Sequence, residues 1–305
     1  MSILLFLNEL SCGTSEPTPR VDDAMERFVE LLRHIRQWRG DTALVTAVKR
    51  EHLQLAQGYY INQWIAARPR HRDLWRVIHS MRNRAPFSDV LPPGAQAGAD
   101  YRWDGHMARA LGAAHVMDGL LVSLLVDPAW DTSWVSARCE ELAEDADGEP
   151  DIDEYRVDVR HAAKSEHALS HEEWIKQAGL SDFRSGSEIW EARADFYPNL
   201  QFLPRVGEHL YGLRPDWVIP VAHRLRTLND AIAEWVPGGE PPWRTKVTPE
   251  AEQRKRLCMF VDFDGIERLF DWHARFTPGA GRIHFRLVPE DGKARIAHIG
   301  SKLGI

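Results

Sequence analysis

Arginine and histidine alternate with apolar residues in two short runs near the C-terminal end of the chain. Successive side chains of a β-strand point to opposite faces, so each run predicts a strand with one apolar and one polar face. The polar faces carry Asp271, His273 and Arg275 in the first run, and Arg282, His284 and Arg286 in the second. We therefore expect one surface on which imidazole and guanidinium groups lie together.

Such a surface has the groups needed to cleave or bind RNA. Attack by a 2′-hydroxyl requires a base, an acid and positive charge at the phosphate; histidine transfers protons near neutral pH, and arginine binds phosphate oxygens. We predict four catalytic residues, which are His273, His284, Arg282 and Arg286, and four residues that contact nucleic acid, which are Arg275, Arg295, His298 and Lys302. Three other interpretations stay open: a solvated face paired with Asp271, a face buried in ion pairs, and a position for His298 on the opposite face.

A second polar group is predicted in the body of the chain. Asn8 follows an apolar run, and Arg160 and His161 end an alternating run that begins at Tyr155. His171 lies on the helix that Ser165 would begin. We predict that Asn8, Arg160, His161 and His171 line a secondary pocket.

His167 and His171 have the i, i+4 spacing of half a metal site. The glutamate that the HExxH pattern requires directly after the first histidine is missing, and neither cysteine nor aspartate completes the set nearby. We therefore predict no metal and no cofactor.

Composition limits the class of protein. The 305 residues carry a net charge of -7, are 44% hydrophobic and include three cysteines without a CxxC pair. A negative chain does not coat nucleic acid over its whole surface, and so few, widely spaced cysteines indicate a reducing compartment. The N-terminus lacks the basic region of a signal peptide, and every apolar run is too short to span a bilayer. We expect a cytoplasmic protein without a membrane partner.

The pattern of apolar residues predicts a mixed α/β fold in two parts. A body from Met1 to Val236 has a mixed sheet with helices, and its acidic stretch from Glu140 to Glu154 is predicted to be a surface loop. A Pro- and Gly-rich linker at 237–242 precedes a tail, Trp243 to Ile305, predicted to be an antiparallel β-meander. The predicted turns of the tail are Asp264-Gly265, Pro278-Gly279 and Asp291-Gly292.

Two resemblances bear on function. The order DWHARFTPGAGRIHFRL, a turn and RIAHIGSKL resembles the C-terminal strands of RelE/HigB-type mRNA interferase toxins, whose Arg, His and Lys side chains bind or cleave RNA on a concave sheet. This resemblance covers about the last fifty residues. The whole chain resembles a bacterial family without an assigned activity that shares the FLNELS start and the HARFTPGxGRIHF…IAxIGxKL end.

These observations lead to hypotheses from different classes. The first is a bacterial protein that acts on RNA or DNA, an RNase-like effector of a toxin or antiphage defence system. The second is a non-catalytic scaffold or sensor subunit of a defence complex, which docks another protein subunit through its C-terminal sheet. A third is a small-molecule enzyme with its site in the secondary pocket. The sequence contains neither GxSxG, nor GxxxxGK[ST], nor GxGxxG, which disfavours a serine hydrolase, a P-loop NTPase and a dinucleotide-binding enzyme.

Overall fold

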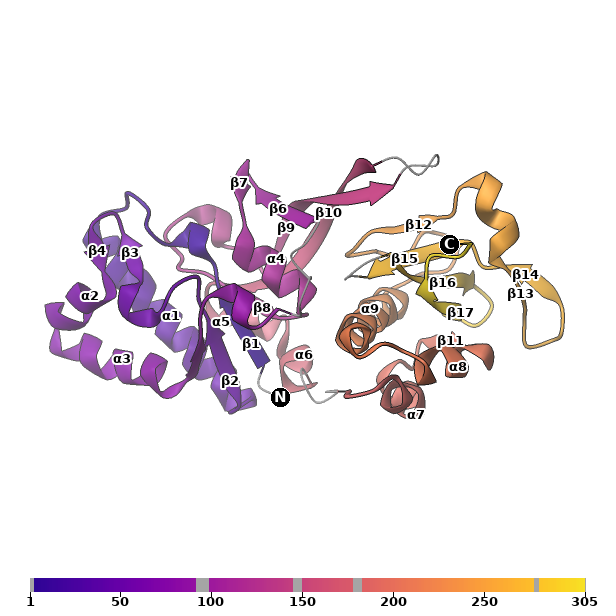
Figure 1. The fold of residues 1–305 in the computed structure, drawn as a ribbon. Coiled ribbons are helices and arrows are strands. Elements are labelled where there is room, and N and C mark those ends of the chain that lie inside the picture. Colours follow the sequence, from indigo (N-terminus) through magenta and orange to yellow (C-terminus); the bar gives the residue numbers. More distant parts are fainter. Residues whose placement is uncertain (1–2, 92–98, 145–149, 178–182, 277–279, 305) are drawn as a thin grey trace. The chain divides into compact units, whose positions relative to one another are not determined.

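The computed structural model describes residues 3–91, 99–144, 150–177, 183–276 and 280–304 (Figure 1). It divides into two compact units. Unit 1 comprises residues 1–91 and 98–181, and unit 2 comprises 92–97 and 182–305. The mixed α/β class predicted from the sequence is confirmed. Each unit contains one large sheet and one separate two-stranded sheet.

Unit 1 is built on an eight-stranded sheet with the order β5-β2-β1-β8-β10-β9-β6-β7. The pairs from β5 to β10 are parallel and the remaining pairs are antiparallel. The strands are β1 Ile3–Leu7, β2 Thr42–Val45, β5 Arg82–Arg84, β6 Ala99–Trp103, β7 His106–Met107, β8 Leu120–Val122, β9 Trp134–Glu144 and β10 Pro150–Ala162. The strand order reverses its direction between β1 and β8, and such switch points form ligand crevices in many doubly wound sheets.

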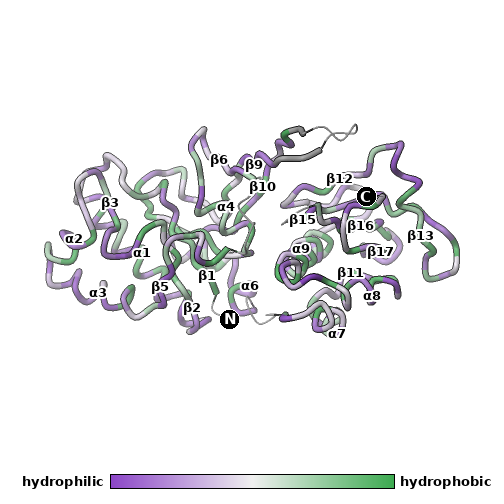
Figure 2. The backbone as a smooth tube through the Cα atoms, viewed as in Figure 1, coloured by the Kyte–Doolittle hydropathy of each residue, from purple (hydrophilic) through white to green (hydrophobic). Residues whose placement is uncertain are grey.

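Helices cover both faces of the parallel part of this sheet. The α-helices are α1 Thr18–Trp38, α2 Ile61–Ala67, α3 Pro69–Ser80, α4 Arg109–Val116, α5 Ser165–Leu169 and α6 Glu172–Gln177; β3 Gln54–Ala56 and β4 Tyr59–Tyr60 form a separate hairpin. Leu5 packs with residues of α1 in one core, and its neighbour Phe6 packs with residues of α4 in another. Burial on both faces explains why β1 is a continuous apolar run, hydrophobic along its length in Figure 2.

The acidic stretch predicted to be a loop is part of a long hairpin. β9 and β10 pair without interruption from Trp134 opposite Arg160 to Glu144 opposite Pro150, and residues 145–149 lie outside the described residues. The prediction was wrong because strand pairing continues into this stretch, where Glu140 and Glu154 find basic partners. Arg138, for example, forms ion pairs with Glu154 and Glu140.

Unit 2 contains a five-stranded sheet with the order β11-β17-β16-β15-β12. β12, β15, β16 and β17 pair antiparallel, and β11 joins β17 in parallel, whereas the run before the predicted Asp264-Gly265 turn forms a separate hairpin instead of the first strand of the meander. The elements are α7 Gly186–Phe196, β11 Leu200–Phe202, α8 Arg205–Tyr211, α9 Pro215–Ala233, β12 Val247–Pro249, the 3-10 helix η5 Glu252–Cys258, β13 Met259–Val261, β14 Glu267–Leu269, β15 Trp272–Phe276, β16 Gly281–Val288 and β17 Lys293–Ser301. Gly265 and Gly292 have positive φ angles at two of the predicted turns, whereas Pro278-Gly279 lies outside the described residues.

The boundary between the units lies before α7, and the predicted boundary at 237–242 falls inside unit 2. Helices α7 to α9 share one hydrophobic core with the C-terminal sheet, where Leu225 of α9 and Phe285 of β16 are both fully buried. A sheet with one apolar face requires a covering layer, and these helices supply it. The Pro/Gly segment is therefore a connection within the unit.

Among the residues that the structure describes, no helix combines the length and the apolar character needed to cross a bilayer.

Candidate functional site

Three predicted site histidines form a row across the C-terminal sheet. His273 of β15 lies opposite His284 of β16, and His284 lies opposite His298 of β17. Their ring centroids are 5.4 Å and 5.8 Å apart, and His209 of α8 extends the row, 4.9 Å from His298. The register shifts just after His284, where β17 carries one extra residue. The row therefore lies on the polar face of the sheet, opposite the core shared with α9.

Two histidines of the row, His273 and His284, are buried. His284 is 0% exposed and His273 is 6% exposed. Cys258, at the end of η5, places its Sγ 3.6 Å from Nδ1 of His284. Burial, together with the cations of Arg282 and Arg275, lowers the pKa of His273 to about 3. Burial and the neighbouring His273 also lower the pKa of His284. Both rings are therefore neutral lone-pair donors at neutral pH, and neither contributes positive charge for a phosphate.

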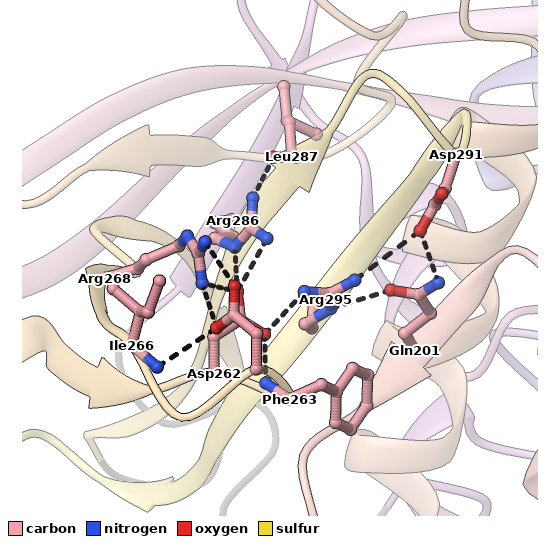
Figure 3. Close-up of polar contacts among 10 residues, drawn as sticks. Gln201, Asp262, Phe263, Ile266, Arg268, Arg286, Leu287, Asp291 and Arg295 are labelled. Carbon is pink, nitrogen blue, oxygen red and sulfur yellow. Dashed lines mark hydrogen bonds and ion pairs between the residues drawn. The ribbon is translucent and has the colours of Figure 1, made fainter.

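Arg286 and Arg295 are held by a buried carboxylate that the sequence did not reveal. Asp262, 4% exposed, accepts hydrogen bonds from Nε of Arg286 at 2.9 Å and from a terminal nitrogen of Arg295 at 2.5 Å (Figure 3). Arg268 adds a third ion pair at 3.4 Å. Burial opposes the charge of Asp262, but hydrogen bonds from the Phe263 amide and the arginines outweigh it and lower the pKa of the carboxyl. The positive charge predicted for a phosphate is thus partly offset by the protein's own carboxylates, since Asp291 also pairs with Arg295 and Asp264 with Arg268.

The remaining predicted basic residues lie along the same sheet. Arg275 and Arg282 are directly opposite each other, two residue pairs along the ladder from His273 and His284. Arg282 is 9% exposed and donates to the carbonyl of Gly281 at 2.9 Å. Lys302 follows β17, where its backbone amide donates to the carbonyl of Ala280. Arg282 and Arg275 lower the pKa of His273, in addition to the larger effect of burial, and Arg282 has little access to solvent.

In unit 1 the structure brings together two residues of the predicted secondary pocket. Ser123, just after β8, accepts a hydrogen bond from Nδ2 of Asn8 at 3.0 Å and lies 2.8 Å from Nε2 of His161. Nδ1 of His161 lies 2.7 Å from the carbonyl of Thr132. A carbonyl only accepts, so Nδ1 carries the proton and Nε2 accepts from the Ser123 hydroxyl.

This chain of hydrogen bonds lies at the switch point between β1 and β8, and its serine–histidine pair has the geometry of an activated nucleophile. However, Asn8, Ser123 and His161 are 2%, 0% and 0% exposed. Burial lowers the pKa of His161 to about 4, which keeps the ring neutral. A hydroxyl without solvent access cannot attack a substrate, so we assign these three residues to a structural network. Ser123 was missed because nothing in its local sequence distinguishes it from other serines.

The other two pocket residues lie elsewhere. Arg160 points away from its neighbour His161 and pairs with Asp118 at 2.5 Å. The guanidinium of Arg160 and the ring of His171 both contact the Trp134 ring. His171 also bonds the carbonyl of Ser133 at 2.7 Å, whereas His167 bonds Asp131 at 3.0 Å. His167 and His171 therefore have separate partners, and the predicted four-residue pocket does not form as a unit.

Sequence reasoning also missed an exposed apolar hairpin. β13 and β14 form a two-stranded sheet of their own, and residues 262–266 connect them. Four large apolar side chains are exposed there: Met259 by 37%, Val261 by 61%, Phe263 by 55% and Ile266 by 56%. Phe260, on the inner face, is buried, and its ring packs against Phe270 at 5.8 Å. The signal was the run MFVDFDGI, which is more apolar than a solvated hairpin requires.

Comparison of the chain with protein-family models, with curated proteins and with solved structures finds no match. The geometry therefore offers two arrangements with chemical or binding potential. One is the buried row of neutral histidines in unit 2, where Glu250, His273 and His284 place possible metal-ligand atoms within 4.8 Å of one another. The other is the exposed apolar hairpin beside it.

Proposed function

We propose that the protein is a non-catalytic docking subunit that binds a protein partner through the hairpin of residues 259–269 in unit 2. The observation that carries this proposal is the concentration of exposed apolar side chains on that hairpin. Met259, Val261, Phe263 and Ile266 all lie within eight residues and are more than one third exposed. Contiguous exposed apolar groups of this kind mark protein–protein contact sites, whereas single exposed apolar residues are ordinary.

The hairpin is held rigidly, which favours a binding role. Asp262 lies at its turn and joins it to β16 through Arg286 and to β17 through Arg295 (Figure 3). The guanidinium of Arg295 also stacks 4.6 Å from the centre of the Phe263 ring. A surface that is already ordered loses little conformational entropy on binding, so more of its contact energy appears as affinity.

The nucleic-acid hypothesis receives less support from the same geometry. Arg286 and Arg295 share the buried Asp262, and His273 and His284 are neutral and covered. Nuclease catalysis would need a phosphate to reach groups that the protein's own residues enclose. We therefore propose docking through the hairpin of residues 259–269 in preference to nucleic-acid cleavage on the C-terminal sheet. We further propose a reducing, cytoplasmic setting, which the free thiols of Cys12, Cys139 and Cys258 support.

The experiment compares two matched variants. Tagged wild-type protein, the double variant Val261→Ser/Ile266→Ser and the control Val236→Ser are expressed in the native host, crosslinked and purified. Val236 is 77% exposed but lies outside the hairpin, so the control removes one exposed apolar side chain elsewhere. Exposed substitutions change stability by only about 0.5 kcal/mol, so all three proteins fold.

We expect a stoichiometric partner with wild type and the control, and at least a roughly tenfold loss with the double variant, equivalent to about 1.4 kcal/mol. Equal partner recovery with the double variant would contradict the proposal. Incubation of the wild-type protein with RNA and DNA runs in parallel. Degradation that His284→Gln abolishes would restore the nuclease hypothesis in its place.

A further inference from the structure

We propose that Glu250, His273 and His284 bind a divalent transition-metal ion, with zinc as the best match to their ligand types. Each residue offers one ligand atom, and the three atoms lie within 4.8 Å of one another. Imidazole nitrogen and carboxylate oxygen are ligands of zinc and similar ions, whereas magnesium and calcium select oxygen alone. This inference revises the sequence-based expectation that no metal is bound, and it does not depend on the docking proposal.

The backbone positions all three ligands independently of any ion. His273 and His284 face each other in the β15–β16 ladder. Glu250 follows β12, whose Thr248 lies opposite His273, and its amide donates to the carbonyl of Asp271 at 2.8 Å. The ligands thus come from three hydrogen-bonded strands in register. Donors on a tetrahedral zinc ion with bonds of about 2.0–2.1 Å lie roughly 3.3 Å apart, so small side-chain rotations complete the site.

The two histidines each present an unused nitrogen. Nδ1 of His273 and Nε2 of His284 are buried and have no hydrogen-bond partner among the described residues. Buried polar atoms in native proteins are normally bonded, and an unbonded one needs a specific explanation. A bound metal ion supplies that explanation for both atoms at once.

The surrounding groups resemble the support that metal ligands receive. Sγ of Cys258 donates to the carbonyl of Arg254 at 3.9 Å, so it can accept from Nδ1 of His284 at 3.6 Å, and Nε2 then keeps its lone pair for an ion. Oε1 of Glu250 accepts from Nε of Arg254 at 3.3 Å. A partner of this kind on the second nitrogen or oxygen orients a ligand and is usual at metal centres.

The charged side chains around the three ligands set the affinity for a metal ion. The cations of Arg275 and Arg282 act on His273 and oppose a dication. Glu250 contributes one negative charge, and its side chain is only 10% exposed, so the attraction to an ion is poorly screened. Three protein ligands leave a further coordination position for water or an added ligand.

The test uses the full-length protein stripped with a chelator, desalted, and supplied separately with zinc, cobalt(II) and magnesium chlorides. We measure metal retained after a second desalting step by mass spectrometry, thermal unfolding, and the visible absorption of cobalt. We expect one equivalent of zinc or cobalt, an increased Tm, and no retained magnesium. Zinc retention below stoichiometry, with no change in Tm, would overturn the proposal.

Matched variants separate a site from general affinity. Glu250→Gln and His284→Gln should each weaken zinc binding by more than about 100-fold. Loss of a residue that only supports a ligand costs up to about 100-fold, so a larger loss identifies a ligand. Glu252→Gln and His52→Gln remove the same group types at exposed positions and should bind like wild type. Because His284 is fully buried and its variant can fail to fold, the partly exposed Glu250 is the deciding position. Equal zinc binding by Glu250→Gln and wild type would refute the assignment.

Discussion

Asp262 is the position at which unit 2 is most sensitive to loss of a single charge. Its side chain is completely buried, and it bonds the Phe263 amide as well as Arg286 and Arg295. Replacement by asparagine keeps the size of the side chain but removes its negative charge. Two arginines that are themselves only 16% and 11% exposed then lose their counter-ion.

The magnitude follows from this burial. Removal of one partner from a buried ion pair costs about 3–5 kcal/mol. The arginines keep some access to water, and the new amide still accepts one hydrogen bond, so we expect about 2–3 kcal/mol for Asp262→Asn. At about 3 °C per kcal/mol for a unit of this size, the Tm of unit 2 falls by roughly 6–9 °C.

The assay is thermal and urea unfolding of wild type, Asp262→Asn and the control Asp264→Asn. Asp264 also pairs with Arg268, through two short hydrogen bonds, but its side chain is 49% exposed. Water screens that pair, so the control should unfold close to wild type. A Tm for Asp262→Asn within about 1 °C of wild type would refute the reasoning, because a buried triple ion pair cannot be lost at so little cost.

Three further predictions concern the remaining buried features. Burial holds the pKa of His161 at about 4, while the unfolded chain binds that proton near pH 6.5. The free energy of unfolding is therefore unaffected by His161 above pH 6.5 and decreases as the pH falls toward 4, because only the unfolded chain takes up the proton. Urea unfolding should show a decrease of about 2 kcal/mol from this residue between pH 7 and pH 5. A flat pH profile would contradict this. Ser123→Ala leaves Asn8 and His161 without a shared partner, so unit 1 should lose about 1–3 kcal/mol, with the exposed Ser136→Ala as its control. Gly186→Ala would place a Cβ of α7 against the carbonyl of Leu210 in α8, and we expect this to destabilise unit 2 by about 1–3 kcal/mol. A variant as stable as wild type would show that α7 and α8 can move apart at no cost.

Local pattern was sufficient for several elements. The apolar run at Ile3–Leu7 is a buried strand because both faces of the parallel sheet are covered. Strand periodicity correctly placed His273 and His284 on the same face, because successive side chains alternate whatever the strand packs against. Two Asp-Gly turns also lie where predicted, since only a residue tolerant of positive φ suits them.

Contacts between distant residues could not be read from the same pattern. The row of histidines gains His298 only through a register shift, which depends on how β16 and β17 pair. The acidic hairpin was mistaken for a loop because nine acids in Glu140 to Glu154 suggest solvent, whereas a basic partner such as Arg102, which pairs with Glu140, comes from a distant part of the chain. The unit boundary was misplaced because a Pro/Gly segment within a unit has the same composition as a linker.

The sequence by itself determined which side chains share the polar face of the C-terminal sheet, because that depends only on the two-residue period of a strand. The tertiary structure decided what those side chains can do. Asp262 reaches Arg286 and Arg295 across 24 and 33 positions of the chain, and η5 brings Cys258 beside His284. These contacts change a face of apparent free cations into paired charges and buried neutral imidazoles. Charge and pKa follow from burial and neighbours, and both are set only when the chain folds.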